Sequence, residues 1–177
     1  MKKHSQKNDD NINREKIGKL TISALLVSMA IICGYIEHLI PFDFGIPGIK
    51  LGLANITVII VLYLIGTKEA FLISLLRILI CFLLFGNVYS FAYSLAGGIF
   101  SLCIMCLMKR FKIFTVTGIS ICGGVTHNIA QILVAVLFVK SLSIALYLPV
   151  LLISGAIMGA CIGIISALII PKIKKIS

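Results

Sequence analysis

One glycine-rich stretch decides how the rest of the chain is arranged: Gly45-Ile-Pro-Gly-Ile-Lys-Leu-Gly-Leu-Ala-Asn-Ile56. It separates two long apolar segments, and Pro47, which lacks an N–H, together with three glycines prevents it from being the middle of a membrane helix. Lys50 stands just before the next apolar run, so a cation, a flexible turn and the free N–H groups of a helix start are close together. This combination suits a carboxylate or phosphate at a membrane surface. The alternative is a loop whose lysine reaches toward the lipid headgroups.

The composition places the chain in a membrane. Of its 177 residues 60% are apolar and only 12% are charged, with a mean hydropathy of +1.15. Soluble domains carry about twice that share of charged residues, which cover their water-facing surface. The 16 basic residues against 6 acidic ones would suggest nucleic acid in a soluble protein. Here the positive-inside rule explains the excess, and no RNA- or DNA-binding motif is visible, so we expect no nucleic-acid partner.

The apolar runs predict an all-α integral membrane protein with six transmembrane helices. We expect a disordered cytosolic tail over residues 1–16, a six-helix membrane domain over 17–171 and a basic cytosolic tail over 172–177. Pro41 ends the first run, and the tight turn at Gly66-Thr-Lys-Glu69 makes the second and third runs antiparallel neighbours. The six runs cover approximately residues 17–40, 51–65, 70–86, 91–108, 115–139 and 144–170.

The basic residues divide unequally between the two sides of this arrangement. With the N-terminus inside, thirteen of the 16 fall on the cytosolic side, counting Lys19 at the start of the first run. Lys50 and Lys140 fall outside, and Arg77 lies within a span. This asymmetry predicts that both termini are cytosolic and that the number of spans is even. Four spans would require the second and third runs to form one re-entrant hairpin.

Polar residues retained inside spans are candidates for function, because hydrocarbon penalises them. Most lie in the middle or outer half of the predicted spans, which predicts a polar cavity that opens outward. The candidate solute-binding residues are Glu37, Lys50, Asn55, Arg77, Asn87, His127, Asn128 and Gln131.

Two structural alternatives apply to these residues. Asn128 and Gln131 can instead form hydrogen bonds between helices and so hold the bundle together. Arg77 cannot lose its charge, and Glu37 is the acidic residue of the outer spans with which it can pair. Without such a pair, Arg77 and Lys50 leave a net positive cavity for an anionic solute.

The sequence shows no complete motif for binding a metal ion or a nucleotide. The six cysteines lie inside apolar runs, where thiols behave as small hydrophobes. Cys103 and Cys106 form a CxxC, but no second pair or nearby histidine completes a zinc site. No GxxxxGK[ST] loop is present, so any ATP must be used by another subunit. We therefore expect no metal, no cofactor and no catalytic residue.

Several strings together resemble a known family. They are Pro47-Gly-Ile-Lys-Leu-Gly-Leu-Ala-Asn55, Leu75-Leu-Arg77, Ser94-Leu-Ala-Gly-Gly98, His127-Asn-Ile-Ala-Gln131 and Leu148-Pro-Val-Leu-Leu-Ile-Ser-Gly155. The chain resembles the Gx transporter family, also labelled heptaprenyl diphosphate synthase component I, over roughly residues 17–170. That family is grouped with the S components of energy-coupling factor transporters.

The resemblance implies a multi-pass protein of a prokaryotic cell membrane that binds a vitamin-like or precursor solute from outside. Its partners would be an energy-coupling transmembrane subunit and two ATPases, with lipid around it. S components contact that subunit through an Ala-xxx-Ala pair on the first helix. Ala24 matches the first position, whereas Ser28 departs from the second.

The synthase label can be examined from the residues. Prenyl diphosphate synthases hold magnesium and diphosphate through aspartate-rich motifs, because hard cations need several oxygen ligands. This chain has only Asp9, Asp10 and Asp43, and no DDxxD. The leading hypothesis is therefore a solute-binding transporter subunit. The alternatives are a non-catalytic membrane subunit linked to heptaprenyl diphosphate or quinone biosynthesis or to electron transfer, and an intramembrane enzyme, which no nucleophile–base spacing supports.

Overall fold

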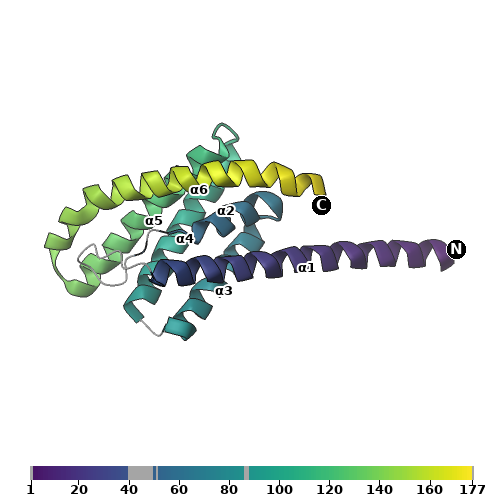
Figure 1. Ribbon diagram of the computed structural model, residues 1–177, viewed down its shortest axis with the longest axis horizontal. Coiled ribbons are helices and arrows are strands. Elements are labelled where there is room, and N and C mark those ends of the chain that lie inside the picture. The colour runs from purple at the N-terminus through teal and green to yellow at the C-terminus, as the bar shows by residue number, and fades with distance from the viewer. Residues whose placement is uncertain (1, 40–49, 51, 86–87, 177) are drawn as a thin grey trace.

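The computed structural model describes residues 2–39, 50, 52–85 and 88–176, with the backbone alone described at 2–16, 19 and 176 (Figure 1). The described residues form helices and no strand, so the all-α prediction is confirmed for them. The helices are α1 (Lys2–Leu39), α2 (Asn55–Leu64), α3 (Thr67–Phe85), α4 (Val88–Phe111), α5 (Val116–Val139) and α6 (Leu148–Ile176), with a 3₁₀ helix, η1 (Leu142–Tyr147), before α6.

Four segments of the described chain are long and apolar enough to cross a membrane. They are Leu20–Leu39, Val88–Phe111, Val116–Val139 and Leu142–Lys175. Helix α3 has 19 residues but carries Lys68, Glu69 and Arg77. Helix α2 has only 10 residues, which reach about 15 Å, half of the hydrocarbon thickness. The membrane class is therefore supported, and the six-span count remains a prediction.

The ends of the chain differ from the sequence-based expectation. Helix α1 continues back to Lys2, through residues for which we expected disorder, and projects beyond the bundle as a single rod (Figure 1). No proline or glycine interrupts residues 2–16, so nothing in the local sequence breaks the helix there. Helix α6 likewise continues past Pro171 into the basic end.

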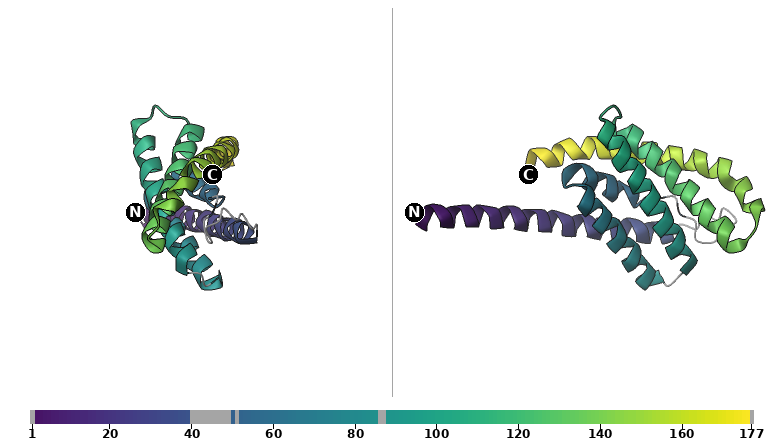
Figure 2. Two further views of the ribbon diagram at one scale, coloured as in Figure 1. Left: turned by 90° about the vertical axis from the view of Figure 1, so that its left-hand side faces the viewer. Right: turned by 180° about the vertical axis from the view of Figure 1, so that it is seen from behind.

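Helix α5 makes the two most extensive helix contacts of the bundle. Its most extensive contact is with α6, followed by the contact with α4, while α3 packs on α1, α2 and α4. Figure 2 shows α4, α5 and α6 running side by side and α1 along the other flank. The short α2 contacts α1, α3, α4 and α6. Six of the seven residues at 56–62 belong to the larger apolar core or its edge, Ile56 and Val58–Leu62.

Glycines allow α5 and α6 to approach backbone to backbone. A Cβ added at Gly124 would lie 2.4 Å from the carbonyl oxygen of Gly155, and one at Gly159 would lie 2.7 Å from Cα of Ile121. The every-fourth-residue glycines of α6 therefore serve packing within the chain, in the manner of small-residue helix pairs in membranes.

Candidate functional site

Side chains of α1 and α5 bind the backbone N–H groups of Lys50, Gly52 and Leu53. The N–H of Lys50 donates to Oε1 of Gln131 on α5 at 3.4 Å. The N–H groups of Gly52 and Leu53 donate to Oε1 of Glu37 on α1. The glycine-rich stretch is therefore the point at which the first and fifth helices are joined, just before α2 begins.

Gly52 is required at this junction by its backbone and by its surroundings. Its φ of +82° lies in the left-handed region that side chains rarely adopt. A Cβ there would lie 3.0 Å from Nδ2 of Asn55 and 3.5 Å from Cδ2 of His127. The absent side chain thus leaves room beside this turn for both the Asn55 amide and the His127 ring.

Glu37 fills the amide site that the sequence suggested for an external anion. Its carboxylate accepts from two N–H groups of the turn that precedes α2, where unpaired donors and the helix dipole favour negative charge. The anion at this turn is therefore the protein's own. A solute would have to use other groups of the cluster.

Arg77 of α3 lies in the same buried region. It is 5% exposed and Glu37 is 7% exposed, and the charges of the two act on each other. Yet Nε of Arg77 and Oε2 of Glu37 have no hydrogen-bond partner. No ion pair joins Arg77 and Glu37 among the described residues, so their pairing stays a prediction. One donor atom and one acceptor atom of these buried charged groups are left unsatisfied, an arrangement that native structures rarely keep without a reason.

His127 and Gln131 form one hydrogen-bonded unit on α5. Nε2 of Gln131 lies 2.9 Å from Nε2 of His127, and Oε1 of the same amide accepts from Lys50. An amide nitrogen only donates, so Nε2 of His127 is the acceptor and the ring carries its proton on Nδ1. The ring lies against Gly97 of α4, where an added Cβ would be 2.7 Å from Nδ1. The unit therefore connects the junction to α4.

Lys50 adds a second positive charge. Burial lowers the pKa of its ammonium group below the ordinary value, the Glu37 carboxylate opposes that change, and the Arg77 guanidinium adds to it. The same two cations, Arg77 and Lys50, both act on His127. Four of the predicted residues therefore lie close enough for their charges to interact: Glu37, Lys50, Arg77 and His127. Gln131 bonds to two of them, and Asn55 lies beside Gly52 at the same turn. We call these six residues the polar cluster.

Asn128 is separated from the polar cluster. Its Nδ2 donates to the carbonyl oxygen of Leu151 at 2.6 Å and reaches Oγ of Ser154 at 3.5 Å, both on α6. Asn128 therefore joins α5 to α6 by a hydrogen bond, the structural role that the sequence analysis gave as the alternative to solute binding.

The remaining predicted residues lie elsewhere. Ala24 and Ser28 are exposed on α1, and the Ser28 hydroxyl donates to the carbonyl oxygen of Ala24 at 3.0 Å, so both occupy one face of that helix. Asn87 lies outside the described residues, as does the segment 40–49 before Lys50, so the outward cavity remains a prediction. Among the described residues, no group of three His, Cys, Asp or Glu side chains is placed to hold a metal ion.

Sequence reasoning missed two residues at the cluster. Gly52 and Gly97 supply the space in which the His127 ring lies. Gly97 entered the sequence analysis only as part of a family string, and no sequence signal identified a histidine as its neighbour. Gly52 was visible only as part of a flexible turn.

The comparisons with known proteins give one match. The family described as "Heptaprenyl diphosphate synthase component I" matches residues 26–169, which include the whole polar cluster. No curated protein and no solved structure matches the chain.

Proposed function

The chain belongs to the heptaprenyl diphosphate synthase component I family, and from that premise we propose that it is a solute-binding membrane subunit that receives a small anionic compound. The family name refers to a component of a synthase, and the chain lacks the aspartate-rich motif on which prenyl diphosphate synthases hold magnesium. The proposed role is therefore binding, with chemistry or energy supplied by other subunits.

The observation that carries the proposal is the unsatisfied charge in the polar cluster. Burying an arginine and a glutamate costs several kcal/mol for each ion unless hydrogen bonds and close pairing compensate. Nε of Arg77 and Oε2 of Glu37 lack such bonds. An anionic group placed against Arg77 and Lys50 would accept from the free donor, and a solute hydroxyl or amine would donate to Oε2 of Glu37.

The charges of the polar cluster limit the class of solute. The cluster holds Arg77 and Lys50 as cations and Glu37 as an anion, and His127 is neutral in the tautomer that Gln131 requires. One positive charge remains uncompensated. This supports a solute with one net negative charge, such as a carboxylate of a vitamin or a quinone precursor, over a diphosphate, whose several charges would exceed the cations available.

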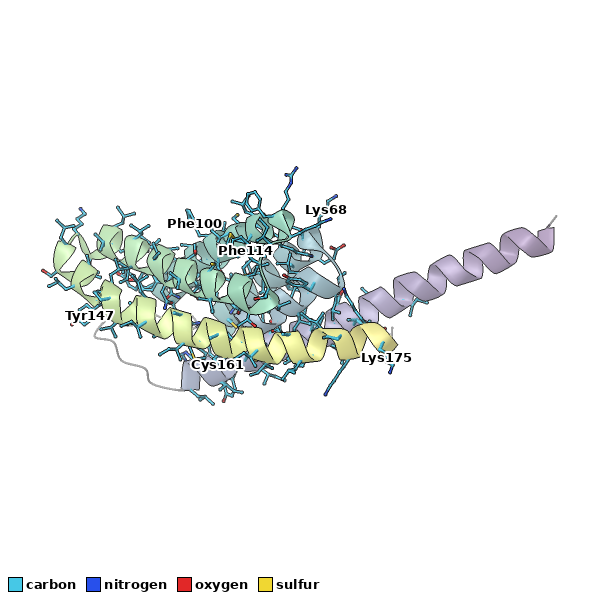
Figure 3. All side chains as sticks on the ribbon, turned by 90° about the horizontal axis from the view of Figure 1, so that it is seen from above. Lys68, Phe100, Phe114, Tyr147, Cys161 and Lys175 are labelled. Atoms are coloured by element: carbon cyan, nitrogen blue, oxygen red, sulfur yellow. The ribbon has the colours of Figure 1, made fainter. Side chains whose placement is uncertain are left out.

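The direction of binding follows from the arrangement of the basic residues. In Figure 3, Lys68 and Lys175 lie toward the end from which α1 projects, and Tyr147 lies at the opposite end. The N- and C-termini also lie toward that basic end (Figure 1). By the positive-inside rule we assign that end to the cytosol. The start of α2, and with it the polar cluster, then belongs to the outer half.

We include in this proposal an importer in which the chain works with a transmembrane coupling subunit and ATPases. The exposed Ala24 and Ser28 on α1 would be the contact with that coupling subunit. The second candidate, favoured by the family description, is a non-catalytic membrane subunit of heptaprenyl diphosphate or quinone biosynthesis. Both candidates use the polar cluster for binding. They differ in which proteins are recovered with the chain on gentle purification.

The test is to purify the full chain in mild detergent and identify retained small molecules by native mass spectrometry. We expect the wild type to carry a compound of one net negative charge. The Glu37→Gln/Arg77→Gln double variant, in which neither charge is left without its counterpart, should lose it, and Lys112→Gln, which removes a charge outside the cluster, should keep it. A wild-type protein that is empty and shows no thermal shift with monocarboxylate vitamins and quinone precursors would exclude the proposed function.

A further inference from the structure

A surface groove lies between α3 and α4, apart from the buried polar cluster. It is an open groove of about 700 Å³ at the ends of these helices. Phe71 of α3 and Leu102 and Leu107 of α4 give it apolar walls, and Lys109 and Arg110 line it in the last turn of α4. The volume lies in the range of sites for small organic molecules.

The two cations of the groove differ in their contacts within the chain. Nζ of Lys109 donates to the carbonyl oxygen of Leu62 at the end of α2 and lies 4.8 Å from the ring centre of Tyr63. This contact fixes its position. Arg110 is exposed and its planar guanidinium can bind a phosphate through two N–H groups. The groove therefore offers one fixed charge and one free donor pair.

The start of helix α3 adds to the positive potential at the same rim, where Lys109 and Arg110 offset the negative end of the dipole in the last turn of α4. Helix α3 begins at Thr67, which lines the groove, and the first turn of a helix carries unpaired N–H groups and the positive end of the dipole. From this rim the apolar walls continue along α4, a helix long and apolar enough to span the membrane. The rim is cationic and the walls are apolar, which matches an amphiphile with a negative headgroup.

We propose that this groove binds an anionic phospholipid. The phosphate lies against Arg110 and Lys109, and one acyl chain follows Phe71, Leu102 and Leu107. Charge complementarity favours this occupant over a zwitterionic lipid, and the apolar length of the groove favours it over a free phosphate. The proposal does not depend on the solute proposed for the polar cluster.

The experiment uses the full-length protein in detergent with added dioleoyl phosphatidylglycerol or dioleoyl phosphatidylcholine, read by native mass spectrometry and thermal unfolding. The wild type should retain phosphatidylglycerol in preference and unfold at a higher temperature in its presence. Arg110→Gln should lower that preference about fivefold, the usual effect of one basic residue near a lipid surface. Lys112→Gln removes an equal charge outside the groove and should leave the preference unchanged.

A steric variant separates the groove from other lipid contacts. Cys103 lines the groove and is exposed, so Cys103→Phe should fill it and displace the retained lipid without any change of charge. Glycerol phosphate, which has no acyl chains, should give no thermal shift. Equal retention of the two lipids by the wild type, unchanged retention by Cys103→Phe, or a shift with glycerol phosphate equal to that with phosphatidylglycerol would each overturn the proposal. A protein that occupies the groove in place of lipid in a Cys103 cross-linking experiment would do so as well.

Discussion

Helix α5 buries polar side chains on two faces, and the two faces treat them differently. Toward α6, Asn128 donates to the carbonyl oxygen of Leu151, and glycines bring the two backbones together. On the other face, Gln131 accepts from the N–H of Lys50 and donates to His127, beside Arg77 and Glu37, two charged groups that each retain an unsatisfied atom. Each face keeps an unsatisfied buried atom of α5, Oδ1 of Asn128 on the first and Nδ1 of His127 on the second, but only the second face adjoins buried charged groups, whose desolvation costs more.

The largest expected effect comes from removing one charge of the polar cluster. Arg77→Gln should lower the free energy of unfolding by about 3 to 5 kcal/mol, because it leaves the Glu37 carboxylate buried without its compensating charge. The Glu37→Gln/Arg77→Gln double variant should recover a large part of that loss. Thermal unfolding in detergent, followed by light scattering, measures both. A single variant as stable as the wild type would show that the two charges do not share one environment.

The face toward α6 is tested by a matched pair of glycine substitutions. Gly159→Ala places a Cβ 2.7 Å from Cα of Ile121 and should lower the free energy of unfolding by about 1 to 3 kcal/mol, as overpacking does. Gly118→Ala meets only Oγ1 of Thr115 at 3.5 Å, so it should be neutral or slightly stabilising. Equal effects of the two variants would contradict the close contact of α5 and α6. Solute retention by folded Gly159→Ala protein should be unchanged.

The two amides of α5 offer a sharper comparison. Asn128→Ala should cost about 1 to 2 kcal/mol, the usual result when a buried hydrogen bond is removed, and should leave solute retention intact. Gln131→Ala should cost a similar amount and also weaken retention, because it releases the backbone of Lys50 and the ring of His127. Native mass spectrometry of the two variants distinguishes them. Loss of solute from Asn128→Ala alone would reverse the assignment of the faces.

The smallest expected effect is a dependence on alkaline pH. Burial lowers the pKa of Lys50 in the folded protein, so between that pKa and the ordinary lysine value the unfolded chain binds more protons. Stability should therefore rise with pH in that window, while binding of an anionic solute falls as Lys50 loses its charge. Lys50→Met should remove both changes, and Lys140→Met, on the loop after α5, should remove neither. Thermal unfolding and solute retention across this range measure the two trends.

The residues of the polar cluster were visible in the sequence because polar groups are rare in apolar segments. Their grouping was not. His127 and Asn128 are adjacent in sequence, and adjacent residues on a helix point about 100° apart, so the pattern could not say which of them faces α6. The glycine-rich stretch indicated an anion site, but only the fold brings Glu37, fifteen positions before Gly52, to its amides.

The sequence by itself determined the membrane class, the helical fold and the family, because these follow from apolar runs, charge distribution and local strings that need no long-range contact. The tertiary structure decided the short α2, the internal carboxylate at its start, the place of Asn128 against α6 and the groove between α3 and α4. Each of these depends on which helices are neighbours and how closely their backbones approach. Packing of side chains from distant segments sets that choice, and no local pattern encodes it.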